Sequence, residues 1–281
     1  MISNLRTLGR NEARVVLTFR EEKRSIVRAA EIIALLGNER KGRKVTQSLV
    51  RKGWLTRLVG GRYLFIPPEY GPENLGENNV LALASAVVEP CYVGWWAAAS
   101  YHSFTTQRPV TTCVATRRQY PSRTIEGNLI RFVPLIERKF FGFQEYEVFG
   151  RKAMISSPAK TVVDCVDRVD LAGGPAEAAR IVHGAESTVR AKEILEAALQ
   201  MKSAAMLQRL GFLLDLVGWV WADPLRRRLR YAIPRTTRNV FGRTERREGD
   251  VGYVPQWGLI VHARAADLLA DVPRAKEANR A

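Results

Sequence analysis

The sequence predicts an α+β protein with a small basic N-terminal domain followed by a larger mixed α/β domain. Helical and alternating apolar patterns occur together in the chain, and a polar stretch containing Pro and Gly separates two parts of different charge. Residues 1–68 hold 15 Lys and Arg against 5 acids, whereas residues 69–150 are nearly neutral. We therefore predict domains at residues 1–68 and 79–281, joined by a linker at residues 69–78.

Three helices are expected in the N-terminal part. The first carries Leu, Val and Phe at approximately helical spacing within residues 5–19. The second is expected over residues 26–37, where Ser25 can cap its start and Gly37 suits its end. The third is expected over residues 39–52 and is strongly basic.

A β-hairpin is expected directly after the third helix. Two short alternating segments, WLTRLV and RYLFI, flank the pair Gly60-Gly61. Paired glycines tolerate the positive φ angles that a tight hairpin turn requires. Two helices, a basic helix and a two-stranded wing, in this order, are typical of a winged helix-turn-helix.

The larger part mixes helices with strands. In SSPAKTVVDCVDRV, Ser157 stands at the N-cap position and Pro158 at the first helical position, which is a strong start signal. The other expected helices are at residues 79–88, 95–104, 175–200 and 203–217. The expected strands are TTCVAT, NLIRFVPL, YEVFG and, near the end of the chain, GLIVHA.

Composition limits the partners. The formal charge of +16 and pI of about 10.3 favour a polyanion, either nucleic acid or an anionic membrane surface. The most apolar segment is interrupted by Glu89-Pro90, so neither half is long enough to span a bilayer. Three widely spaced cysteines indicate neither a disulfide framework nor a zinc site. We expect a cytoplasmic protein with no cofactor, no metal and no membrane partner.

The segment GNERKGRK from Gly37 resembles a phosphate-binding loop, but its chemistry does not fit one. Such a loop needs Lys directly after the second Gly and then Ser or Thr for magnesium. Here Gly42 is followed by Arg43, Lys44 and Val45. A membrane-surface helix would need a bulky apolar face, and this helix offers only Gly, Val and Leu.

The third helix instead suits DNA. Gly42, Val45 and Leu49 fall on one side, where they can pack, and polar and basic residues fall on the other. Arg and Lys supply charges for phosphates, while Gln and Arg can also bind base edges in a major groove. The alternative is a merely solvated basic face. The candidate DNA-binding residues, including two on the wing, are Arg40, Arg43, Lys44, Gln47, Ser48, Arg51, Arg57 and Arg62.

A second basic surface is expected near the C-terminus. Residues 226–247 contain nine Arg, one Glu and no Lys, with Tyr231 and Phe241 among them. Arg binds phosphates, carboxylates and flat bases, so this stretch fits either nucleic acid or an acidic protein partner, or is a solvated loop. Its arginines are Arg226, Arg227, Arg228, Arg230, Arg235, Arg238, Arg243, Arg246 and Arg247.

No catalytic constellation is found in the sequence, and we expect a protein that is not an enzyme. The three histidines are isolated from one another. Asp164, Asp167 and Asp170 have helical spacing, but such a run is typical of a solvated face, and Lys160 can pair with Asp164 across one turn. Neither a nucleophile elbow nor a DxD metal motif occurs.

The order of motifs resembles the AbiEi-type antitoxins of type IV toxin–antitoxin systems. The resemblance rests on KGWLTRLVGGRYLFIP, YVGWWAAASYHSFTTQRP, CVATRR, SPAKTVVDCVDRV and LQRLGFLLDLVG, and it runs over roughly residues 25–262. In this family Glu commonly precedes the Lys, where Ala159 stands in this chain. The weight comes from the order of the motifs, since none is diagnostic by itself.

This resemblance implies a repressor that binds repeated operator sequences of its own operon through its winged helix. It also implies a C-terminal domain that counters a co-encoded nucleotidyltransferase toxin, typically without a stable complex. Two alternatives stay open. The basic ends could together bind RNA, or the Arg-rich stretch could bind an acidic protein directly.

Overall fold

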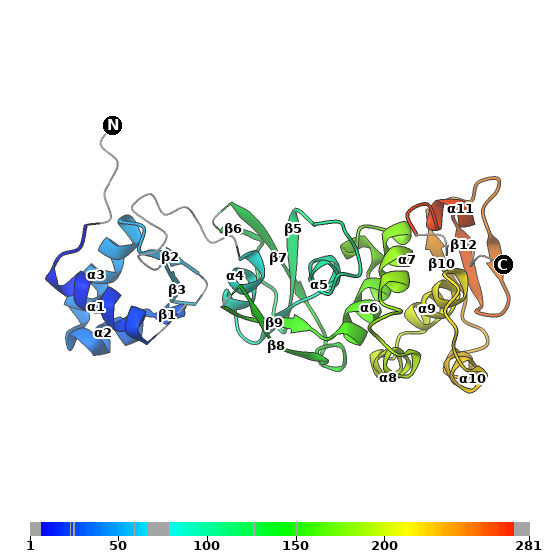
Figure 1. Ribbon diagram of the computed structural model, residues 1–281, viewed down its shortest axis with the longest axis horizontal. Helices are drawn as coiled ribbons and strands as arrows, with labels where there is room; N and C mark the ends of the chain where they lie inside the picture. The colour runs from blue at the N-terminus through cyan, green and yellow to red at the C-terminus, as the bar shows by residue number, and fades with distance from the viewer. Residues whose placement is uncertain are drawn as a thin grey trace, which may run out of the picture.

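The fold is α+β, as the sequence predicts. The computed structural model describes residues 7–22, 24, 26–58, 60–66, 79–125, 127–149 and 151–272. In Figure 1 the N-terminal unit lies at one end, a six-stranded sheet in the middle, and a layer of helices with a small three-stranded sheet at the other end.

The N-terminal unit contains three helices and a small antiparallel sheet. Its strand order is β1-β3-β2, so β3 pairs with both neighbours. Gly60 and Gly61 have φ angles of 68° and 72°, which confirms the tight turn between β2 and β3. The elements are α1 (Arg10–Glu21), β1 (Ile26–Arg28), α2 (Ala29–Leu36), α3 (Glu39–Arg51), β2 (Leu55–Arg57) and β3 (Arg62–Phe65).

The predicted start of the second helix was wrong. Its first three residues form β1, which pairs with residues 62–64 of β3. The sheet gains its third strand in this way, and Val27 is fully buried there. The helix starts at Ala29 instead, where the Glu31 carboxylate accepts a 2.6 Å hydrogen bond from the Arg28 backbone N–H. Gly37 ends α2 as predicted, with a φ angle of 65°, whereas Ser25 lies outside the described residues.

The central sheet has the strand order β6-β7-β5-β4-β9-β8 and mixes parallel with antiparallel pairs. The three predicted strands TTCVAT, NLIRFVPL and YEVFG are found as β5, β7 and β8. The other three strands of this sheet, β4, β6 and β9, were not predicted, because their sequences show no clear alternation of apolar and polar residues. The bounds are β4 (Cys91–Val93), β5 (Thr111–Thr116), β6 (Arg123–Ile125), β7 (Asn128–Pro134), β8 (Phe143–Val148) and β9 (Arg151–Ser156).

The two faces of the central sheet carry different helices. Cys91 and Val93 of β4 lie in a buried cluster with α4 (Val80–Ala86), while Tyr92 between them faces a second cluster. That second cluster extends through α5 (Trp95–Tyr101) and α6 (Pro158–Asp167) toward the C-terminus. Because neighbouring strand residues point to opposite faces, Tyr92 is directed at α6.

The helical layer follows the sheet. Ser157 caps α6 as predicted, accepting a hydrogen bond from the Lys160 backbone N–H at 3.4 Å. The single helix predicted over residues 175–200 was wrong, because the chain turns inward after Gly184 to bury Ala185 and Val189. A Cβ on Gly184 would lie 2.3 Å from the Phe104 carbonyl oxygen. The helices are α7 (Pro175–Gly184), α8 (Ala191–Met201) and α9 (Ala204–Leu216), with short 3-10 turns η2 (Glu137–Lys139) and η3 (Val169–Leu171) before them.

The C-terminal elements pack on α9. A Cβ on Gly211 would lie 2.4 Å from the Trp257 ring, so the small sheet approaches this helix closely. GLIVHA forms a strand, as predicted, and this strand lies at the centre of the small sheet. The Arg-rich stretch is partly helix and partly strand rather than only a loop. The elements are α10 (Asp223–Tyr231), β10 (Asn239–Gly242), β11 (Gly252–Val254), β12 (Leu259–His262) and α11 (Ala265–Leu268).

The N-terminal unit packs on the central sheet. Leu58, Leu64 and Ile66 belong to the same buried cluster as Val87 and Val88 at the end of α4. The predicted linker at residues 69–78 lies entirely outside the described residues, so the domain boundaries stay a prediction. This shared cluster means that the two predicted domains are in direct apolar contact.

Candidate nucleic-acid interface

The inner face of α3 is held closely against α2. Gly42, Val45 and Leu49 are buried, as their spacing predicts. A Cβ on Gly42 would lie 2.8 Å from the Cα of Ile33, which is nearer than real Cβ contacts come. Gly42 therefore allows the two helix backbones to approach, and that approach fixes which side of α3 faces solvent.

The outer face of α3 is basic and open. The Asn38 side chain caps the helix by accepting a hydrogen bond from the Lys41 N–H at 2.9 Å. Arg43 pairs with Glu39 at 2.5 Å. Among the described residues, the other exposed cations of the predicted site on this helix form no ion pair. The predicted residues Arg40, Arg43, Lys44, Gln47 and Arg51 are exposed, and Ser48 is half-buried.

The two wing arginines differ in their surroundings. Arg57 on β2 is exposed, as a DNA contact requires. Arg62 on β3 has only 13% of its side chain exposed and pairs with Glu89 at 3.1 Å. The predicted placement of Arg62 on a free wing surface is therefore wrong. Glu89 lies in the turn before β4, far along the chain from the hairpin, so the hairpin sequence alone could not predict this ion pair.

A buried carboxylate joins α1 to α3. Glu12 accepts hydrogen bonds from the Lys52 ammonium at 2.6 Å and from the Gly9 backbone N–H at 2.7 Å. Burial alone would raise its pKa, but the hydrogen bonds from Lys52, Ser48 and Gly9 outweigh burial and lower the pKa of Glu12. The end of the candidate recognition helix is thereby tied to the first helix.

The nine arginines of the second basic surface fall into three groups. Arg226 and Arg243 are bonded to carboxylates of Asp215 and Asp250. Two lie over aromatic rings, Arg230 over Trp257 at 5.7 Å and Arg238 over Tyr253 at 5.2 Å. The rest are exposed, and within the described residues their guanidinium groups form no ion pair: Arg227, Arg228, Arg235, Arg246 and Arg247.

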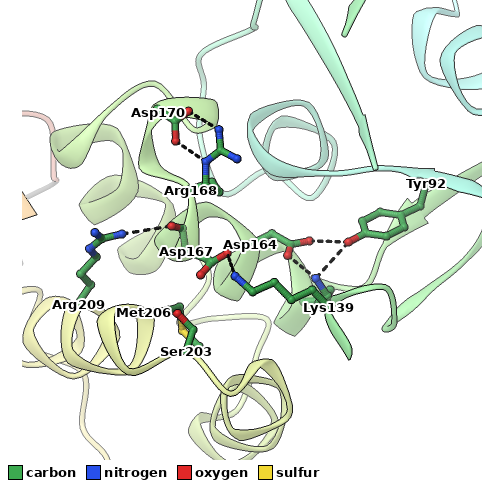
Figure 2. A network of polar contacts seen from close by, with 10 residues as sticks. Tyr92, Lys139, Asp164, Asp167, Arg168, Asp170, Ser203, Met206 and Arg209 are labelled. Atoms are coloured by element: carbon green, nitrogen blue, oxygen red, sulfur yellow. Dashed lines mark hydrogen bonds and ion pairs between the residues drawn. The ribbon is translucent and has the colours of Figure 1, made fainter. Parts of the chain in front are cut away.

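A buried polar network between the central sheet and α6 was missed from the sequence (Figure 2). The Tyr92 hydroxyl donates to Asp164 Oδ2 at 3.1 Å and accepts from the Lys160 ammonium at 3.1 Å. Lys160 also pairs with Asp164, which confirms the pairing expected across one helical turn. Burial raises the pKa of Asp164, although Lys160 opposes this, and it raises the pKa of Tyr92 well above the usual value.

The expected solvated face of three aspartates was wrong. Asp164 is 2% exposed, and Asp167 is paired with Lys139 at 2.6 Å with 10% of its side chain exposed. Asp170 is exposed and bonded to the Arg168 guanidinium, as Figure 2 shows. The Asp167 backbone carbonyl accepts a hydrogen bond from Arg209 of α9 at 3.2 Å. The network joins β4, α6 and α9, and its shielding from solvent suits it to holding these elements together.

Other chemistry-bearing residues are dispersed. Cys91, Cys113 and Cys165 are free and buried, and burial raises the pKa of the Cys91 thiol to about 12. In the described part of the chain, no three His, Cys, Asp or Glu side chains are grouped as a metal site would require. Within the same residues, none of the helices combines the length and the apolar character needed to cross a bilayer.

Comparison with known proteins identifies the fold but no family. No protein-family model matches the chain, and a search of curated proteins finds no match. Among solved structures, the chain is similar to the RV2827C protein from Mycobacterium tuberculosis, with a TM-score of 0.64 and 16% sequence identity. The similarity covers 94% of this chain and 95% of that one, so the N-terminal unit, central sheet and C-terminal elements share their arrangement with a known structure.

Proposed function

We propose that this protein binds duplex DNA through a winged helix-turn-helix formed by its N-terminal unit. The supporting observation is the division of α3 into a closely packed face and an open face with four cationic side chains, Arg40, Arg43, Lys44 and Arg51. A helix fixed in this way can enter a major groove without rearrangement. Lys44 and Arg57 supply phosphate contacts, while Gln47 and Arg51 read base edges.

The wing extends this surface. β2 and β3 follow α3 directly, and Arg57 is exposed at the end of β2. Contacts by Arg57 to phosphate would fix the register of α3 on the duplex without reading sequence. The open surface then carries both the positioning and the reading contacts that specific binding needs.

We further propose that the protein is a cytoplasmic autorepressor and antitoxin, and not an enzyme. The motif order shared with AbiEi-type antitoxins supports this role. In this proposal the N-terminal unit binds the protein's own operator, and the C-terminal part counteracts a co-encoded nucleotidyltransferase toxin without forming a stable complex. A nucleotidyltransferase gene adjacent to this one would support the antitoxin role.

Quantitative DNA binding tests the repressor role. The full chain is titrated against the duplex upstream of its own gene, a shuffled duplex of equal composition, and a structured RNA, at several salt concentrations. We expect the upstream duplex to bind tightest, with a steep salt dependence. Equal affinity for upstream and shuffled duplexes would refute a sequence-specific repressor, and a preference for the RNA would favour the RNA-binding alternative.

A further inference from the structure

The second basic surface contains a site that duplex binding by α3 leaves unused. On α10, Leu225 and Leu229 face the protein interior, and Leu229 is fully buried. Arg227 and Tyr231 lie one turn apart on the opposite face. Tyr231 is 93% exposed, so its ring is open to a ligand from solvent.

Three guanidinium groups surround this tyrosine. Arg227, Arg230 and Arg235 line an open depression of ≈ 470 Å³ together with Tyr231, Ile233 and Pro234. None of the three forms an ion pair with any residue that the structure describes. Three unneutralised charges on one depression attract an anionic ligand with more than one negative group.

The depression is partly preorganised. Arg230 is supported by the Trp257 ring, and the following turn is closed by a 3.1 Å hydrogen bond from the Thr237 N–H to the Pro234 carbonyl. The nearby carboxylates of Asp215 and Asp223 are both bonded to Arg226. They therefore do not neutralise the arginines of the depression.

We propose that this depression binds single-stranded nucleic acid, with a base stacked on Tyr231 and phosphates bound by Arg227, Arg230 and Arg235. An exposed ring among cations supplies both interactions that single-strand sites use. The carboxylates of an acidic peptide would pair with the arginines, but they offer no flat ring to stack on Tyr231. A lone phosphate ion would likewise leave the exposed Tyr231 ring without a partner.

Labelled oligo-uridine and oligo-thymidine test the site in the full chain. We expect Tyr231→Ala to weaken binding about tenfold, in line with the loss of one stacked base. Tyr231→Phe keeps the ring and should bind like the wild type. Arg123→Ala removes an equal charge from the exposed edge strand β6 and should also leave binding unchanged. Arg227→Ala with Arg235→Ala should weaken binding and flatten its salt dependence.

A further variant distinguishes single-strand binding at this depression from duplex binding by α3. Replacing Arg40, Lys44 and Arg51 together should abolish operator binding but preserve the Tyr231-dependent single-strand binding. A preference for one oligonucleotide would identify RNA or DNA as the ligand. The proposal is overturned if Tyr231→Ala binds like the wild type, if Arg123→Ala weakens binding equally, or if polyglutamate competes as well as the oligonucleotides.

Discussion

Glu89, in the turn before β4, pairs with Arg62 on the wing at 3.1 Å and lies 3.8 Å from Arg28 on β1. The central part of the chain thus places a carboxylate against two arginines of the N-terminal unit. This carboxylate neutralises charge beside the proposed DNA-binding surface. The sequence predicts Arg62 on that surface, but its guanidinium group is paired with Glu89 instead.

Glu89→Gln removes a negative charge beside the proposed DNA-binding surface, so it should increase affinity for duplex DNA about two- to fivefold. The increase is small because the Glu89 side chain is largely exposed and exposed ion pairs are weak. If the released Arg62 then binds a phosphate, the slope of log affinity against log salt steepens by about one. Salt-dependent titrations measure both effects. Glu137→Gln removes a similar exposed charge far along the chain, in η2, and should change neither. Wild-type affinity and slope in Glu89→Gln would contradict the prediction.

Gly42→Ala should destabilise the N-terminal unit, although alanine normally stabilises a helix interior relative to glycine. The added methyl group would overlap the Ile33 backbone, and such overpacking costs about 1 to 3 kcal/mol. Urea unfolding measures the change, with Lys41→Ala on the exposed side of α3 as the control. An unfolding free energy equal to or above that of the wild type would show that α2 and α3 are not in such close contact.

Glu12→Gln should lower stability at neutral pH by about 1.5 to 3 kcal/mol, since it weakens charge-assisted hydrogen bonds between α1 and α3. The folded pKa of Glu12 is lowered, so its stabilisation is present above the unfolded pKa of about 4.5 and is lost as pH falls through the folded value. Urea unfolding at a series of pH values should therefore show the variant and wild type converging in acid. Glu39→Gln, at an exposed pair, should follow the wild type. A difference that stays constant with pH would argue against this assignment.

Gln47→Ala and Arg57→Ala should affect DNA binding differently. Loss of a base contact by Gln47 should cost about 1 to 3 kcal/mol and relax preference at one operator position. Loss of Arg57 should weaken binding to all duplexes alike and reduce the salt slope by about one. Titration against a panel of single-base operator variants distinguishes the two. Identical effects of both substitutions would mean that α3 does not read base edges as proposed.

Lys160→Met should destabilise the protein by about 3 to 5 kcal/mol, because it leaves the buried Asp164 carboxylate without its cation. The double variant Lys160→Met with Asp164→Leu removes both charges and should recover much of the loss. Thermal unfolding of the two variants provides the comparison. If the double variant is as unstable as the single one, then packing rather than an uncompensated charge causes the loss.

The sequence by itself determined the local elements of this protein. Glycines at positive φ fixed the end of α2 and the hairpin turn, and Ser157 fixed the start of α6. The periodicity of α3 separated its buried side from its basic side, since helical spacing alone assigns residues to faces. These features depend on residues a few positions apart, so they can be read from the chain.

Only the tertiary structure decided what these elements contact. Residues 26–28 became a strand because β3 was available to pair with them, and Asp164 was buried because Tyr92 of β4 lies opposite α6. Arg62 is not on the exposed surface of the wing, because its side chain pairs with Glu89. Each outcome depends on a partner distant in sequence, and burial and charge pairing are properties of the assembled chain rather than of any local pattern.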